Sequence, residues 1–271
     1  MGYIPIHDKI DFANKGQDFN QSDLINESAF GVICDGVSSS VDAGLGAQFA
    51  CQLVMQELRE GSLDTNINFN YQNIYDLVIN QLNETAPNLN SNISTNKSSL
   101  ATTIITAVIG GNKAQFSYCG NGAILEIRKE WFDLPQEIPL PWGINNYLNP
   151  HSRLVDGDNK LYKVLKASEE NKYVEAEIVT LTRASKLTSY FLICSDGLYS
   201  SDEISTSWDN EQTNYYIQES MRLLLFLKIL RKHHHENWCN RENFSTEFRA
   251  CIIDHKMLLD DLSYVLFIPE L

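Results

Sequence analysis

Two short apolar runs in this 271-residue chain each lead into an Asp-Gly pair, and this feature constrains the fold most. The first run, Phe30–Cys34, leads into Asp35-Gly36. The second, Tyr190–Cys194, leads through Ser195 into Asp196-Gly197. Short apolar runs bounded by turn residues predict buried strands. A single Asp-Gly pair is most often only a turn, but two pairs at the ends of buried strands favour a functional site.

A third acidic position adds to this pattern. Asp260 and Asp261 lie just before a further predicted strand, Tyr264–Ile268. Carboxylates that converge from several strand ends would repel one another strongly unless a cation lay between them. With a cation they form an all-oxygen site of the kind that Mg²⁺ or Mn²⁺ prefers. The sequence therefore predicts a site for hard divalent cations at these strand ends.

The rest of the chain predicts a mixture of helices and antiparallel strands. Apolar residues at helical spacing predict helices over 43–60, 71–83, 214–232 and 243–257. Short apolar runs separated by tight turns predict strands over 102–109, 114–119 and 123–128, and a later strand around 172–181. A loop is expected over 84–99 and a long surface excursion over 131–160. No shift in composition marks a linker, so one domain over residues 1–271 is expected.

Charge and apolar run length disfavour several classes of partner. The chain has 21 Lys and Arg against 35 Asp and Glu, a net charge of −14. Nucleic acids and anionic membranes attract basic proteins, so neither is an expected partner. The longest apolar runs, such as Leu223–Leu227, are far shorter than the ~20 residues of a membrane span, and the N-terminus does not match a signal peptide. Since none of the six cysteines forms a CxxC pair, a reduced, cytoplasmic protein is expected.

Several motifs, taken in order, resemble the type 2C metal-dependent protein serine/threonine phosphatases, especially their divergent bacterial branch. The segments that carry the resemblance are Asn14–Asp18, Phe30–Gly36, Ser98–Thr103, Cys119–Gly122, Phe191–Leu198 and Asp260–Ser263. Their order and spacing, over roughly residues 10–268, are more specific than any single motif.

The resemblance implies an α+β fold, a four-layer αββα sandwich in which two antiparallel sheets pack face to face with a helical pair outside each. It also implies a phosphoric monoester hydrolase that removes phosphate from phosphoserine and phosphothreonine. Two Mg²⁺ or Mn²⁺ ions would activate the attacking water. The implied partners are a phosphorylated protein substrate and, as a candidate, a cognate protein kinase.

The same resemblance implies a role for each of five residues. Asp35 would bridge the two ions, and the carbonyl oxygen of Gly36 would bind one of them. Asp196 and Asp260 would hold the other ion, and Asp18 would support the site directly or through water. Asp35, Asp196 and Asp260 are thus the expected catalytic residues.

Several positions depart from the family pattern. Ala13 stands where the family carries an Arg that grips the substrate phosphate, and Lys15 could replace it only as a point charge. Gln17 stands where many members have a second acid, and Asn121 stands in place of an Asp that helps hold a third cation. These departures leave a second hypothesis open, a catalytically weak or dead phosphatase fold that acts as a binding or regulatory module.

Other motifs have simpler interpretations. His233–His235 and Cys239 resemble transition-metal ligands, but a solvated helix end is favoured. Asp156–Lys160 resembles the start of a calcium loop, but Ala167 stands where that loop requires Glu, so a hairpin turn is expected. A phosphatase of the haloacid-dehalogenase type would need an acid two residues after its nucleophilic Asp. Val37 stands at that spacing after Asp35, so this class of enzyme is disfavoured.

Overall fold

The computed structural model describes residues 2–12, 16–40, 42–61, 69–86, 100–133, 144–155, 158–167, 173–185, 187–199, 204–209, 212–217 and 221–270. Two five-stranded antiparallel sheets form its centre. The first sheet has the strand order β1 (Tyr3–Ile10), β16 (Leu262–Pro269), β13 (Tyr190–Cys194), β7 (Ala123–Ile127) and β8 (Ile144–Asn146). The second has the order β12 (Glu177–Thr182), β6 (Lys113–Cys119), β5 (Ile104–Gly110), β3 (Ser28–Asp35) and β2 (Asp18–Ile25).

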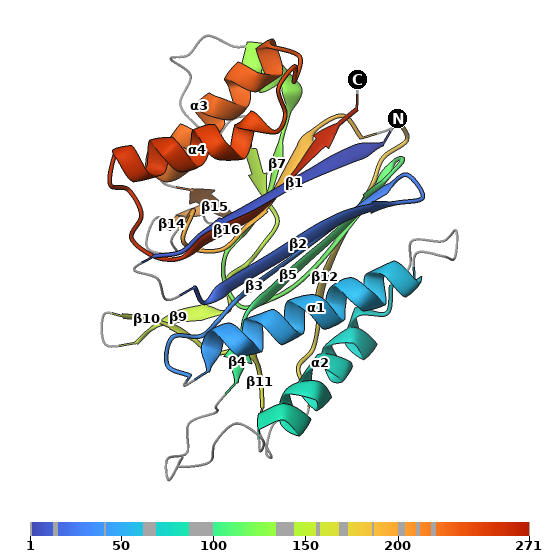
Figure 1. The fold of residues 1–271 in the computed structure, drawn as a ribbon, viewed down its shortest axis with the longest axis vertical. Helices are drawn as coiled ribbons and strands as arrows, with labels where there is room; N and C mark the ends of the chain where they lie inside the picture. Colours follow the sequence, from blue (N-terminus) through green and yellow to red (C-terminus); the bar gives the residue numbers. More distant parts are fainter. Residues whose placement is uncertain are drawn as a thin grey trace.

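Four α-helices in the described part of the chain cover the sheets. The helices are α1 (Ala43–Gly61), α2 (Tyr71–Thr85), α3 (Met221–His235) and α4 (Asn243–Asp254). Figure 1 shows α1 and α2 beside the second sheet, and α3 and α4 beside the first. The expected mixed α+β fold with two antiparallel sheets is therefore confirmed.

Three apolar clusters fill the space between these elements. One joins α1 and α2 to the second sheet, one lies between the two sheets, and one joins the first sheet to α3 and α4. In β3, Phe30 and Val32 belong to the cluster under the helices, whereas Ala29 and Ile33 belong to the cluster between the sheets. Because alternate side chains point to opposite faces and both faces are buried, this strand has a continuous apolar sequence.

An aromatic cluster attaches α3 and α4 to the first sheet. The ring of Phe226 on α3 lies 5.2 Å from that of Phe244 and 5.0 Å from that of Phe248, both on α4. It also lies 5.1 Å from the ring of Tyr264 on β16. All three contacts are edge-to-face, the arrangement that aromatic quadrupoles favour. The strand that follows Asp260 is thus held in place by both helices.

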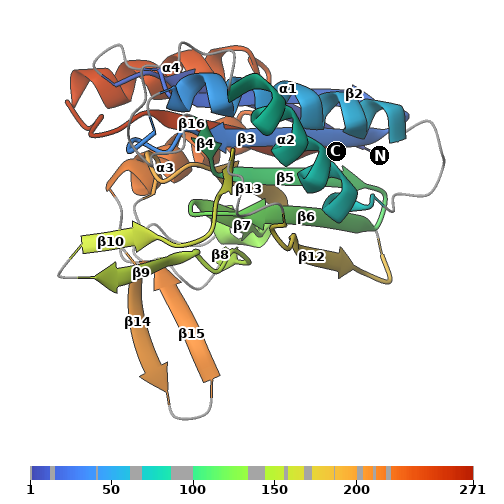
Figure 2. The same ribbon diagram turned by 90° about the horizontal axis from the view of Figure 1, so that it is seen from below.

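Shorter elements lie outside the two sheets. They are β4 (Ala101–Thr102) paired with β11 (Leu165–Lys166), β9 (Ser152–Val155) paired with β10 (Asp158–Leu161), β14 (Ile204–Asp209) paired with β15 (Gln212–Ile217), and a 3-10 helix, η2 (Lys129–Asp133). Figure 2 shows the β9–β10 and β14–β15 hairpins projecting from the sheets. The β9–β10 pairing agrees with the hairpin turn expected in place of a calcium loop.

The predicted helices are confirmed in position, with two corrections at their ends. The helix predicted over 214–232 begins only at Met221, because residues 214–217 belong to strand β15. The aromatic and β-branched residues of that segment suit a strand as well as a helix. The helix predicted over 243–257 ends at Asp254. There Lys256 takes a left-handed φ of 53°, and the N–H of Met257 donates to the carbonyl of Ile252, which closes the helix end.

The remaining sequence expectations have mixed outcomes. Strands β1 and β2 were not predicted, because both lie at sheet edges and β2 is largely polar. The described part of the excursion over 131–160 contains short strands rather than only loop.

The prediction of a solvated helix end is wrong for His233, which is 2% exposed, and right for His235, which is exposed. Ala13, Lys15 and residues 87–99 lie outside the described residues.

None of the helices that the structure describes is both long and apolar enough to cross a membrane.

A buried carboxylate on β7 links the two sheets away from the acidic strand ends. Glu126 is fully buried and accepts hydrogen bonds from Tyr147 Oη at 2.6 Å and Ser189 Oγ at 2.8 Å. It also pairs with the guanidinium of Arg183, which follows β12 of the second sheet, at 2.5 Å. Burial alone would raise the pKa of Glu126, but the hydrogen bonds and the charge of Arg183 outweigh it and lower that pKa.

Replacing Arg183 by Met should therefore destabilise the protein. Removing one partner of a buried pair costs about 3–5 kcal/mol, and the 43% exposure of the Arg183 side chain reduces the expected loss of unfolding free energy to about 2 kcal/mol at pH 7. The pKa of Glu126 is lowered in the fold, so the stability that its ionised form contributes is lost as the pH falls through that value. The loss caused by the variant should accordingly shrink in acid. Urea unfolding between pH 4 and pH 7 measures both effects.

Lys232→Met provides the control, because it removes an exposed ion pair with Glu247 and should change stability little at any pH. Equal stability of Arg183→Met and Lys232→Met would show that the Glu126–Arg183 pair does not hold the sheets together.

Candidate active site

The structure brings the four predicted acids to one end of the two sheets. Asp18 begins β2 and Asp35 ends β3, and the two residues lie opposite each other in the antiparallel register. Asp196 follows β13 and Asp260 precedes β16, both in the first sheet. Because β16 contacts both β2 and β3, the acidic ends of the two sheets lie together. The sequence therefore identified acids that the fold does bring to one place.

The carboxylates of this acidic site interact strongly with one another. Burial raises the pKa of Asp18 to about 7 and that of Asp196 to about 6. The pKa of Asp35 is raised well above its usual range, first by burial and then by the charges of Asp18 and Asp196. Asp18 is only 1% exposed, whereas Asp35 and Asp196 are half-buried and Asp260 is exposed. Near neutral pH this group of acids needs either protons or a cation.

The backbone of Asp35 is fixed by the start of the central hairpin. The N–H of Thr103 donates to the carbonyl oxygen of Asp35 at 2.8 Å, and Thr102 Oγ1 donates to the same oxygen at 2.9 Å. Gly36 continues the chain under the N-terminus of α1, where an added Cβ would lie 2.6 Å from the carbonyl carbon of Ala43. Only glycine allows this close approach, so helix α1 can begin directly beside the site.

The turn Gly120-Asn121-Gly122 reaches the site from the end of β6. The amide nitrogen Nδ2 of Asn121 donates a hydrogen bond to Asp196 Oδ2 at 2.5 Å, which lowers the pKa of Asp196 against the effect of burial. The amide oxygen Oδ1 of Asn121 is buried and has no hydrogen-bond partner among the described residues. Gly120 and Gly122 have φ values of 119° and 111°, which non-glycine residues rarely adopt.

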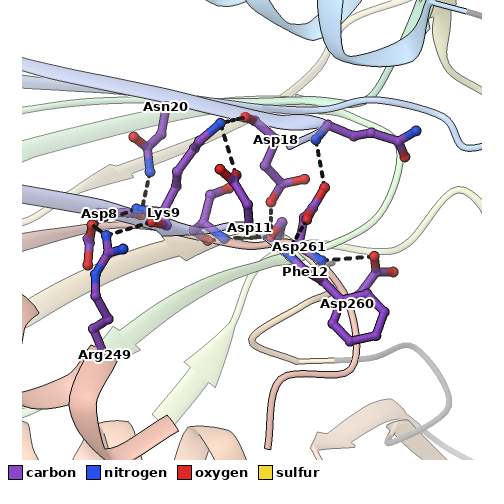
Figure 3. Close-up of polar contacts among 12 residues, drawn as sticks. Asp8, Lys9, Asp11, Phe12, Asp18, Asn20, Arg249, Asp260 and Asp261 are labelled. Atoms are coloured by element: carbon purple, nitrogen blue, oxygen red, sulfur yellow. Dashed lines mark hydrogen bonds and ion pairs between the residues drawn. The ribbon is translucent and has the colours of Figure 1, made fainter. Parts of the chain in front are cut away.

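Asp261 holds both ends of the segment that leads into Asp18. Its Oδ1 accepts from the backbone N–H of Phe12 at 2.5 Å and its Oδ2 from that of Gln17 at 2.6 Å. Lys9 Nζ donates to the backbone carbonyl of Asp18 at 2.9 Å. Figure 3 shows these contacts, with Asp260 next to Asp261 at the edge of the cluster. Asp261 thus binds backbone N–H groups with both carboxylate oxygens. Asp260 Oδ1 accepts from the N–H of Asp261 at 2.9 Å, but the carboxylate of Asp260 is exposed and accessible to other ligands.

Ser195 links the strand end of Asp196 to Asp18. Its Oγ donates to Asp18 Oδ2 at 2.7 Å and accepts from the N–H of Ser263 at 3.0 Å. Because Ser263 lies on β16, Ser195 follows β13 and Asp18 begins β2, this hydroxyl joins the first sheet to strand β2 of the second sheet. The hydrogen bond to Asp18 favours its ionised form.

The donor set suits Mg²⁺ or Mn²⁺. Within the described ranges, no three His, Cys, Asp or Glu side chains converge closely enough to hold an ion together. The available ligands are carboxylate and amide oxygens, with no thiolate or imidazole among the predicted set, which is the chemistry that hard cations prefer. The unpartnered buried oxygen of Asn121 and the raised pKa values of Asp35 and Asp196 both fit a cation at this position.

The roles of some residues of the site were not predicted from the sequence. Ser195 and Asp261 lie next to the predicted acids Asp196 and Asp260, so their positions in the sequence indicate that they lie near the site. Thr103 lies in a segment that carries the family resemblance. His151, which hydrogen-bonds to the turn at Gly120, gave no signal because 31 residues separate the two.

Comparisons with known proteins identify the family and the fold. The sequence model described as protein phosphatase 2C matches residues 14–225. The chain has no significant match among curated protein sequences. Similar solved structures include a bacterial serine phosphatase, with 13% identity, a TM-score of 0.64, and coverage of 99% of this chain and 100% of that one.

Two further structures are similar. The serine/threonine phosphatase Stp1 from Staphylococcus aureus has 14% identity and a TM-score of 0.63, with 100% of this chain and 96% of that chain covered. RsbX in complex with magnesium has 14% identity and a TM-score of 0.53, with 97% and 93% covered. At these identities the structures show a shared fold. Because the family model matches most of the sequence, this chain belongs to the protein phosphatase 2C family.

Proposed function

We propose that the protein is a metal-dependent phosphatase that removes phosphate from phosphoserine and phosphothreonine in a protein substrate. The observation that carries the proposal is the group of four carboxylates, from Asp18, Asp35, Asp196 and Asp260, at the meeting ends of the sheets. Membership of the protein phosphatase 2C family supports it. The magnesium complex of RsbX, a protein with the same fold, supports the choice of cation.

Each predicted site residue would have its own role in cation binding. Asp35 would bridge two ions, Gly36 would offer its carbonyl oxygen, and Asp196 and Asp260 would hold the second ion. Asp18 would act as a ligand directly or through water. Bound Mg²⁺ or Mn²⁺ lowers the pKa of water, which then supplies the nucleophile at neutral pH.

The surroundings of these residues support their roles. Thr102 and Thr103 fix the backbone of Asp35, and Asn121 holds the carboxylate of Asp196 in one orientation. We further propose that residues 1–271 form a single phosphatase domain that works in the cytoplasm, with a cognate protein kinase as a candidate partner.

The second candidate is a binding or regulatory module with weak or no catalysis. Two observations favour it. The phosphate-gripping Arg of the family is replaced by Ala13, and the described acids do not converge closely enough to hold an ion as they stand. Because a binding module can hold a cation without catalysing hydrolysis, a hydrolysis assay is needed to separate the two candidates.

Hydrolysis of a phosphopeptide should require a divalent cation. With Mn²⁺ or Mg²⁺ present, the protein should release phosphate from phosphoserine and phosphothreonine peptides and from a small aryl phosphate. Excess chelator should abolish release, and restored Mn²⁺ should recover it. A colorimetric phosphate assay measures this. Full activity in chelator would rule out the proposed mechanism, and cation binding without hydrolysis would favour the binding module.

Replacing Asp35 by Asn should abolish cation-dependent activity and yet stabilise the cation-free protein. The pKa of Asp35 is raised in the fold, so ionisation of this group destabilises the fold as the pH rises above the ordinary carboxyl value. In chelator at pH 8, the variant should therefore melt at a higher temperature than wild type, and the difference should disappear near pH 4. Mn²⁺ should stabilise wild type much more than the variant. Differential scanning fluorimetry measures each of these shifts.

Asp23→Asn is the matched control, because Asp23 lies on the same strand as Asp18 but forms an exposed pair with Arg59. It should leave both activity and the Mn²⁺ shift unchanged. An Asp35→Asn protein that is as active as wild type would remove Asp35 from the ligand set.

Replacing Asn121 by Asp should make the protein more dependent on cations. The change removes the amide that donates to Asp196 and places a second carboxylate against it. Without a cation the repulsion should lower the melting temperature, whereas Mn²⁺ should neutralise the added charge. We expect a larger Mn²⁺-induced shift than in wild type, with equal or higher turnover at saturating Mn²⁺.

Calorimetric titration should also detect an additional bound ion in Asn121→Asp. Asn112→Asp is the control, because Asn112 lies in the exposed turn between β5 and β6 and donates to the carbonyl of Arg183. The same ion stoichiometry and the same rate in Asn121→Asp and wild type would exclude Asn121 from the site.

A further inference from the structure

We propose that His151 is a positioning residue of the acidic site, because its ring holds the Gly120–Gly122 turn that sets Asn121 against Asp196. His151 is 5% exposed and has no part in the chemistry proposed above. The proposal deepens the proposed function, on which its effect on cation binding rests. Its structural part, that the ring fixes the turn, can be tested without any cation.

Two hydrogen bonds join His151 to Gly120. The backbone N–H of His151 donates to the carbonyl of Gly120 at 2.8 Å. The N–H of Gly120 donates in return to the ring nitrogen Nδ1 of His151 at 3.0 Å. Both backbone hydrogen-bonding groups of Gly120 are thus bound to one residue. Since Nδ1 accepts, the ring must be neutral with its proton on Nε2.

The ring itself is fixed on both sides. It stacks on Tyr118 at 5.4 Å between centroids with an interplanar angle of 25°, and Tyr162 packs against it at 5.8 Å. Nε2 faces Glu177 Oε1 at 3.8 Å, and Lys163 forms an ion pair with the same oxygen at 3.0 Å. A ring held in this way is a rigid acceptor, which is what a positioning role requires.

The turn that His151 holds lies between the two halves of the acidic site. An added Cβ on Gly120 would lie 2.5 Å from Cβ of Thr103, the residue whose N–H binds the carbonyl of Asp35. An added Cβ on Gly122 would lie 2.4 Å from the carbonyl oxygen of Cys194, two residues before Asp196. Movement of the turn would therefore disturb the strand ends that carry Asp35 and Asp196, as well as the Asn121–Asp196 hydrogen bond.

A buried histidine could instead serve only to fill space. The two roles differ in which ring atom matters. In Asn the amide oxygen Oδ1 takes the place of Nδ1 and can accept from Gly120, whereas the longer Gln side chain places its amide near Nε2. A positioning role thus predicts rescue by His151→Asn but not by His151→Gln or His151→Ala, and a space-filling role predicts no advantage for Asn.

The first test measures hydrogen exchange of the Gly120 amide in chelator. Exchange should be several-fold faster in His151→Ala and His151→Gln than in wild type, and close to the wild-type rate in His151→Asn. This readout needs no cation and no activity. Wild-type exchange rates in all three variants would overturn the proposal even if the protein proved to be an active phosphatase.

The second test measures Mn²⁺ affinity by calorimetric titration. Loss of a group that orients ligands typically weakens metal binding by about 10-fold to 100-fold, so we expect at least about 10-fold weaker binding for His151→Ala and near-wild-type binding for His151→Asn. His233→Ala is the control, since it removes another buried histidine, bound to Glu247 on α4. It should lower stability and leave Mn²⁺ affinity unchanged.

The outcomes separate the two proposals. Unchanged Mn²⁺ affinity in folded His151→Ala, or equal affinity in the Asn and Gln variants, would overturn the positioning role while leaving the proposed function intact. Absence of Mn²⁺ binding to wild type would overturn the proposed function, and hydrogen exchange at Gly120 would still decide whether His151 holds the turn.

Discussion

Mutual repulsion among carboxylates at the meeting ends of the two sheets is the constraint on which the rest of the site depends. Asp18 and Asp35 face each other across adjacent strands, and Asp196 raises the pKa of both. In a partly buried environment such charges can persist only with hydrogen-bond donors, protons or a cation nearby. The surrounding structure supplies the donors, through Ser195 to Asp18 and Asn121 to Asp196, while the fixed strand ends prevent the acids from moving apart.

The contrast with Glu126 shows that a buried carboxylate in this fold does not always have a raised pKa. Glu126 is more deeply buried than Asp35 or Asp196, but it has an Arg183 guanidinium and two hydroxyl donors, and its pKa is lowered. Asp18, Asp35 and Asp196, at the other end, have raised pKa values. The charge of Glu126 is thus balanced within the protein, whereas the acids at the strand ends favour binding of protons or of a cation.

Backbone geometry allows the site to be this compact. Gly36 lets the start of α1 approach β3, and the glycines on either side of Asn121 let its turn fit between Thr103 and Cys194. Other contacts of the site link residues far apart in the chain, such as His151 with Gly120 and Asp261 with Phe12. The acidic site therefore depends on correct packing of both sheets, and α3 and α4 contribute by holding the strand that follows Asp260.

The sequence by itself determined the buried strands, the helices and the identity of the acids. A strand that is buried on both faces requires a continuous apolar run, and a sharp turn at its end favours residues such as Asp-Gly. Both requirements are local and can therefore be recognised in the sequence. Only the tertiary structure decided that β15, rather than helix, occupies residues 214–217, and that edge strands β1 and β2 complete the sheets. It also decided that Asp261 binds backbone while Asp260 stays exposed, and that His151 meets Gly120. Those choices depend on which segments become neighbours on folding, and no local pattern of residues carries that information.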